Sequence, residues 1–149
     1  MIPWVDIVIL ALSLAGLADG LYFTFAYYGR IKKARWIPEI LCAREGSSCV
    51  TVVQTPYARV LGVPNSLLGI LYYLALMIWI AWSNLRQGGG PDRQALEIAT
   101  ALLLVASAAS VVVGLYLIHA LRKRLHIHCP FCYLAHAINI LLFILLVLD

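Results

Sequence analysis

The stretch CPFCYLAHAINILLFILLVL, residues 129–148, is apolar along almost its whole length. About 20 apolar residues in an α-helix are enough to cross the hydrocarbon core of a bilayer. Three further stretches have this length and character: 4–28, 64–83 and 95–121. The sequence therefore predicts an all-α membrane protein, a bundle of four transmembrane helices in a single domain over residues 1–149.

The composition agrees with a membrane protein. Of the 149 residues, 63% are hydrophobic and 12% are charged, whereas soluble domains have about 45–50% apolar and about 25% charged residues. The first span lacks a basic segment before it and is longer than the apolar core of a signal peptide, so we interpret it as a retained helix. The net charge of +4 does not indicate nucleic-acid binding, because the bases cluster in predicted membrane-edge loops beside phospholipid headgroups.

The four cysteines form two close pairs, Cys42 with Cys49 and Cys129 with Cys132. The first pair lies in the long connection between the first and second spans, and the second pair opens the last span. Because every span reverses the direction of the chain, the first and third connections lie on the same side of the membrane. Both pairs are therefore expected at one membrane face, where disulfide exchange between them is possible.

The Cys129-Pro-Phe-Cys132 unit has the spacing of a redox-active dithiol. Residues three apart on a helix have Cβ atoms about 5–6 Å apart, so a disulfide closes with little movement. Pro130 suits the first helical position, and the helix N-terminus favours a thiolate. A structural disulfide is one alternative. A zinc or copper site formed with His126 and His128 is the other.

The other pair brackets the segment Ala-Arg-Glu-Gly-Ser-Ser within the connection 29–63. This composition predicts a flexible loop that can present one sulfur outward and the other inward. A static crosslink between Cys42 and Cys49 would close a short ring and add little stability. We therefore interpret the pair as an electron shuttle.

The arrangement of motifs resembles the vitamin K epoxide reductase family over nearly the whole chain. The resemblance lies in the loop pair after the first span, in TPYARVLGVP (55–64), in SLLG (66–69), and in the Cys-x-x-Cys motif that opens the fourth span. The bacterial periplasmic disulfide-forming enzymes, another group of four-helix thiol oxidases, carry their Cys-x-x-Cys motif ahead of their loop pair. The order of motifs separates this chain from that group.

The resemblance implies a role for each cysteine. Cys132 would face a quinone and Cys129 would be its exchange partner. Cys49 would relay electrons to Cys129, while Cys42 would meet the thiols of a thioredoxin-like partner. A quinone of the ubiquinone or menaquinone type would be the electron acceptor.

Four residues are candidates for the quinone site. By the resemblance, Asn65 matches an asparagine that hydrogen-bonds the quinone or epoxide oxygen, and His136 replaces a tyrosine with the same task. Thr55 stands where the family usually has serine or threonine. Asp19 is a candidate for its own chemistry, because an ionisable group inside a span usually faces the bundle interior; the alternative is a structural, hydrogen-bonded carboxyl.

These observations predict a quinone-dependent membrane thiol oxidase that generates disulfides. The same cysteines could instead reduce vitamin K quinone or its epoxide. In a different class, the chain could be a non-enzymatic membrane metal-binding protein or a scaffold with static disulfides.

The basic residues predict the orientation in the membrane. Of the 11 Lys and Arg residues, only Arg86 and Arg93 lie on the side opposite the cysteines. The positive-inside rule therefore predicts that the cysteine face is cytoplasmic, whereas the resemblance implies a lumenal or outer face. A thiol oxidase that faces the cytoplasm needs a host with disulfide-bonded cytosolic proteins, and hyperthermophiles are the recognised case. The nine bases predicted on the cysteine side are Arg30, Lys32, Lys33, Arg35, Arg44, Arg59, Arg122, Lys123 and Arg124.

Overall fold

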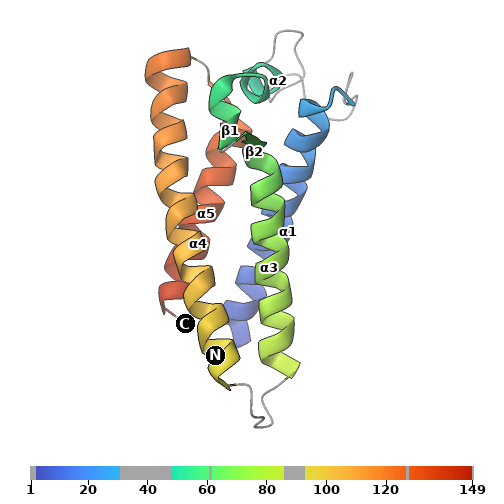
Figure 1. Ribbon diagram of the computed structural model, residues 1–149, viewed down its shortest axis with the longest axis vertical. Helices are drawn as coiled ribbons and strands as arrows, with labels where there is room; N and C mark the ends of the chain where they lie inside the picture. The colour runs from blue at the N-terminus through green and yellow to red at the C-terminus, as the bar shows by residue number, and fades with distance from the viewer. Residues whose placement is uncertain (1–2, 31–47, 61, 86–92, 127, 149) are drawn as a thin grey trace.

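The computed structural model describes residues 3–30, 48–60, 62–85, 93–126 and 128–148 (Figure 1). Within them, four helices are long and apolar enough to cross a membrane. Their boundaries lie within two residues of the predicted spans. The predicted four-helix membrane fold is therefore confirmed. The four helices are α1 (Pro3–Tyr27), α3 (Asn65–Leu85), α4 (Arg93–Ala120) and α5 (Pro130–Leu148).

The connection between α1 and α3 has more regular structure than the flexible loop predicted from the sequence. The backbone of Cys49 lies in a helix, because Val53 in the same helix is buried against Phe23 of α1. This packing corrects the loop prediction for residues 48–53, while Cys42 lies outside the described residues. The elements of this connection are α2 (Ser48–Val53), the 3₁₀ turn η2 (Pro56–Ala58), and the antiparallel pair β1 (Arg59–Val60) and β2 (Val63–Pro64).

The connection between α4 and α5 also differs from the predicted loop over 122–128. It begins as a π-helical turn, η3 (Leu121–Leu125), which ends at His126 in the left-handed conformation with φ 54°. The side chains of residues 122–124 are basic and exposed. Positive charges are favourable at the C-terminal end of a helix, so these bases support the added turn.

The core of the bundle forms where α1, α3 and α5 meet. Ile9, Leu76 and Leu142, one from each helix, are fully buried. At Gly16 of α1, a Cβ atom would lie 2.8 Å from Cε2 of Tyr73 on α3, so glycine is needed for this approach. Small residues at helix contacts allow such close packing in membranes.

Hydrogen bonds between side chains connect α3 to α4. The Trp79 indole N–H donates to Thr100 Oγ1 at 3.0 Å, and the Tyr72 hydroxyl donates to Ser107 Oγ at 2.8 Å. Such bonds contribute about 0.6 kcal/mol each inside membrane proteins. They therefore specify how the helices pair more than they stabilise the bundle.

Large apolar side chains also cover the outside of the bundle. Soluble proteins rarely expose large contiguous apolar patches, whereas a membrane-spanning bundle presents such side chains to lipid. Exposed examples on α3 and α4 are Leu71, Ile78, Leu102, Val105 and Val112.

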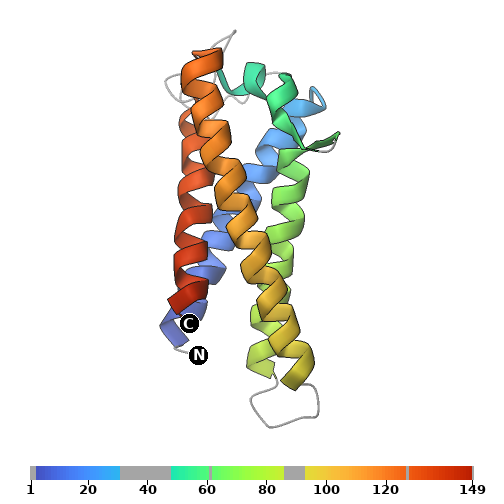
Figure 2. The same ribbon diagram turned by 60° about the vertical axis from the view of Figure 1, so that its left-hand side comes forward.

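The two ends of the bundle are different. Figures 1 and 2 show α2 and the first turn of α5 together at one end, whereas the first turn of α1 and the last turn of α5 lie at the other. This arrangement follows from four crossings. It brings the helix that contains Cys49 to the same end as Cys129 and Cys132.

Candidate functional site: a disulfide and the cavity beside it

Cys129 and Cys132 are joined by a disulfide at the start of α5, with their Cα atoms 5.3 Å apart. Pro130 is the first residue of the helix, as the sequence predicted. Cys129 therefore stands in the capping position. The backbone N–H of Cys132 donates a hydrogen bond to Sγ of Cys129 at 3.3 Å. Backbone N–H groups in the first turn of a helix have no partner within the helix and favour negative charge nearby. This hydrogen bond would therefore stabilise a thiolate at Cys129.

The disulfide lies in an apolar cluster that contains Phe23 of α1, Val53 of α2 and Leu121 of η3. Cys129 is 0% exposed and Cys132 is 8% exposed. A thiol that attacks Cys129 must therefore come from within the protein or follow a movement of the covering elements.

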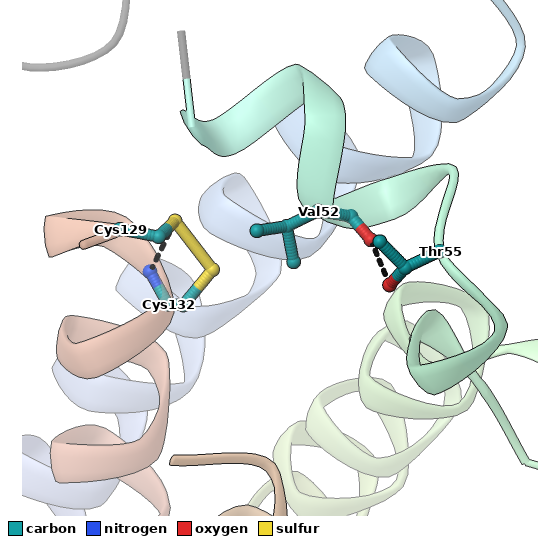
Figure 3. Close-up of a disulfide and its surroundings, with 4 residues drawn as sticks. All are labelled: Val52, Thr55, Cys129 and Cys132. Carbon is teal, nitrogen blue, oxygen red and sulfur yellow. Dashed lines mark hydrogen bonds between the residues drawn. A yellow bond between two sulfur atoms is a disulfide. The ribbon is translucent and has the colours of Figure 1, made fainter. Parts of the chain in front are cut away.

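Helix α2 covers the disulfide from the side of the α1–α3 connection. Val52 and Val53 pack against the cluster that holds both sulfurs, and Figure 3 shows the Val52 side chain directed toward the disulfide. The backbone of Cys49 lies one helical turn before Val53. The structure thus brings the helix that carries one loop cysteine onto the second pair.

A cavity of about 140 Å³ extends from the disulfide into the bundle. Cys132 is among the residues that line it, whereas Cys129 is not among the described residues that do so. Most of the wall is apolar and includes Phe23, Leu117 and Leu121. An apolar cavity of about 150 Å³ is large enough to bind benzene, so this cavity has room for a six-membered ring.

Three polar side chains that line the cavity have a buried atom without a hydrogen-bond partner among the described residues. These atoms are Asp19 Oδ1, Asn65 Oδ1 and His136 Nδ1. Leaving a buried polar group unpaired costs about 1–3 kcal/mol. A polar molecule in the cavity could supply the missing partners.

Local structure constrains two of these three side chains, Asn65 and His136. The Asn65 amide donates from Nδ2 to the Tyr57 carbonyl at 3.1 Å, which ties the start of α3 to η2. At Gly114 of α4, a Cβ atom would lie 2.7 Å from His136 Nδ1, so only glycine leaves room for the imidazole. Asp19 lies on α1 in the turn before Phe23.

The deep end of the cavity is formed by two residues that the sequence reasoning did not place in the site. Tyr73 and Asn139 both line it, and the Tyr73 hydroxyl donates to Asn139 Oδ1 at 2.8 Å. A signal was present on α3, where Asn65, Gly69 and Tyr73 recur every four residues and therefore share one face.

Thr55 lies elsewhere. Its hydroxyl donates to the Val52 carbonyl at 2.7 Å, and it is not among the described side chains that line the cavity. Figure 3 shows this hydrogen bond at the end of α2. Its position suits a residue that holds α2 in place.

The described residues do not assemble a metal site. Among them, no three His, Cys, Asp or Glu side chains are grouped closely enough to hold a metal ion. His126 Nδ1 lies 3.1 Å from the Arg122 carbonyl oxygen, and the two sulfurs of the proposed ligand set are bonded to each other. The site is thus a disulfide beside an apolar cavity with unpaired polar atoms.

Comparison with known proteins agrees with this site. The sequence profile of the Vitamin K epoxide reductase family matches residues 7–147, nearly the whole chain. No curated protein sequence gives a significant match. The matched range includes both cysteine pairs, the whole of α3 and α4, and nearly all of α1 and α5.

Proposed function

The chain belongs to the vitamin K epoxide reductase family, membrane oxidoreductases that act on disulfides with quinones, and we propose that it is a thiol oxidase. In this proposal the chain acts as a single four-helix unit. Electrons enter from a thioredoxin-like partner, pass through Cys42 and Cys49 to Cys129 and Cys132, and leave on a quinone of the ubiquinone or menaquinone type.

The observation that carries the proposal is the cavity beside Cys132. The cavity is lined by Cys132 of the pair and by Asn65 and His136, each with a buried polar atom that has no partner among the described residues. Its walls suit an apolar ring. A quinone has a ring of this kind with a carbonyl oxygen at each end, so the residues fit it. A dithiol that closes to a disulfide releases two electrons and two protons, which a quinone takes up to become a quinol.

Asn65 and His136, which line the cavity, would orient the quinone ring. Asn65 is tied to the Tyr57 carbonyl, so its Oδ1 is presented at a fixed place to accept a hydrogen bond from a quinol hydroxyl. An imidazole such as that of His136 can donate to a carbonyl oxygen or accept from a hydroxyl. We assign Thr55 the task of holding α2 against the disulfide.

Electron entry would proceed by two disulfide exchanges. The Cys49 thiolate attacks Cys129, so that the Cys129–Cys132 bond breaks, a Cys49–Cys129 bond forms and Cys132 leaves as a thiolate. The Cys42 thiolate then attacks Cys49, which closes Cys42–Cys49 and frees Cys129. The packing of α2 on the disulfide supports this route.

A trapping experiment tests the exchange. In the double variant Cys42→Ala, Cys132→Ala, the two resolving thiols are absent and the Cys49–Cys129 bond cannot be broken from within the chain. We expect mild oxidation to convert most of the protein to this crosslinked form, measured by mass spectrometry of peptides under non-reducing conditions. The variant Cys49→Ala, Cys132→Ala is the control and should give no such peptide. Absence of the Cys49–Cys129 peptide from the trapping variant would exclude the route.

The direction of flow follows the reduction potentials. A difference of 30 mV corresponds to about 1.4 kcal/mol for a two-electron couple. In our proposal an oxidised respiratory quinone has the higher potential and draws electrons from the dithiols of a thioredoxin-like protein. Supplying vitamin K epoxide in place of quinone to the reduced protein tests the alternative substrate class.

For the orientation, we propose that the cysteine face is cytoplasmic, on the strength of the nine bases on that side. An enzyme reporter joined after Asp149 would then lie outside the cytoplasm, since four crossings place both ends of the chain opposite the cysteines. We expect alkaline phosphatase, which needs an oxidising compartment, to be active in this fusion, and a cytoplasmic reporter such as β-galactosidase to be inactive. The reverse pattern would show that the cysteines face outward.

A further inference from the structure

We propose that Asp19 and His136 form a catalytic pair that delivers the two protons of quinone reduction. The inference rests on the proposed function, because it concerns how the same cavity completes the reaction. It assigns Asp19 and His136, which both line the cavity, a chemical task in addition to binding.

Each of the two groups lies about one helical turn, along its own helix, from a residue of the cluster that holds the disulfide. His136 follows Cys132 by four residues on α5, one helical turn further into the bundle. Asp19 precedes Phe23 by four residues on α1, and Phe23 packs in the cluster that holds the disulfide. Both side chains line the cavity, so a ring that contacts Cys132 has one proton carrier on each of two walls.

Asp19 and His136 each keep one atom that could bind a molecule in the cavity. Asp19 Oδ1 and His136 Nδ1 are buried and have no hydrogen-bond partner among the described residues. Tyr73, which also lines the cavity, donates its hydroxyl to Asn139. An ionisable side chain inside a membrane is costly, and packing does not explain a carboxyl whose Oδ1 is buried there without a partner among the described residues.

The chemistry requires proton carriers at this place. Disulfide exchange leaves Cys129 and Cys132 as thiolates, which take up two protons to become thiols. When these thiols close their disulfide, two S–H bonds break, one S–S bond forms, and two electrons and two protons leave the sulfurs. Cys132 lines the cavity, but Cys129 is fully buried, so its proton has no direct path to a bound quinone. Asp19 and His136 can each hold a proton and pass it to one of the two quinone oxygens.

The chain offers a matched control on the same helix. Asp6 of α1 is also buried, and its Oδ1 also has no partner among the described residues. Its Oδ2 accepts a hydrogen bond from Asn84 Nδ2 at 3.2 Å, and it is not among the described residues that line the cavity. Asp6 is therefore a buried carboxyl on the same helix as Asp19, but it does not belong to the described residues that line the cavity.

The test separates the quinone step from the disulfide exchange. Reduced protein is mixed anaerobically with a short-tailed benzoquinone, and quinol formation is followed in a single turnover in H₂O and in D₂O. Exchange is measured without quinone, as reduction of the oxidised protein by a small dithiol. General acid–base groups contribute about 10²- to 10⁴-fold to rate, so we expect Asp19→Asn and His136→Gln to slow quinol formation at least about 100-fold and to raise its solvent isotope effect. Exchange should stay at the wild-type rate.

Two further variants make the result specific. Asp19→Glu should restore much of the rate, because it returns a carboxyl to the same wall, and Asp6→Asn should behave as wild type. Wild-type quinol formation in Asp19→Asn and His136→Gln would overturn the pair, as would an equal loss of exchange, which would indicate a structural role. Failure of the unmodified protein to form quinol would instead remove the proposed function itself.

Discussion

Replacement of Cys132 by alanine is expected to reduce quinol formation on the order of 10⁶-fold, by analogy with the loss when a serine protease is deprived of its nucleophile. The physical reason is the position of the two sulfurs, because Cys132 lines the cavity and Cys129 does not. In the proposed mechanism, every electron pair that reaches a bound quinone therefore leaves from Cys132. The rate is measured by the change in quinol absorbance after anaerobic mixing of pre-reduced protein with quinone.

The matched control for this variant is Leu134→Ala. Leu134 lies two residues further along α5 and is 50% exposed on the outside of the bundle, so its truncation should leave turnover within about twofold of wild type, as is usual for surface substitutions. Sustained quinol formation by Cys132→Ala would show that the second sulfur of the pair is not the electron donor.

Replacement of Cys42 by alanine is expected to separate two kinds of electron donor. Turnover driven by a thioredoxin-like protein should fall roughly 10³-fold or more. In the proposed route Cys42 both meets the partner's thiols and resolves the Cys49–Cys129 bond within the chain. A small dithiol can resolve that bond from solution, so turnover with dithiothreitol should remain partly active. Quinol formation with each of the two reductants measures the difference.

The control is Cys49→Ala, which removes the relay for both donors. Because Cys129 is 0% exposed, this variant should be slow with the protein and with the small dithiol alike. Equal activity of Cys42→Ala with both donors would mean that the first loop cysteine does not meet the partner protein.

The four long helices and the start of α5 could be predicted from the sequence because they depend on local properties. A run of about 20 apolar residues is a helix in a bilayer, where each backbone N–H and C=O must be paired within its own segment. Pro130 after Cys129 marks the helix start for an equally local reason, since proline suits the first helical position. Asp19 and His136 were recognisable as polar residues inside apolar spans.

The remainder of the site depends on which helix faces which. Hydropathy along α3 does not reveal that Tyr73 reaches Asn139, nor does the sequence of the first connection reveal that α2 docks on the disulfide through Val53. The same holds for Thr55, whose hydroxyl is directed to its own helix end.

Order along the chain thus specified the helices, the membrane and the Cys129–Cys132 pair, since these follow from single segments and from the count of crossings. Contacts between segments selected Cys132 over Cys129 as the sulfur at the cavity and made Gly114 the space for His136. The reason is physical: apolarity fixes a helix by itself, whereas a cavity exists only where side chains from several helices fail to fill the space between them.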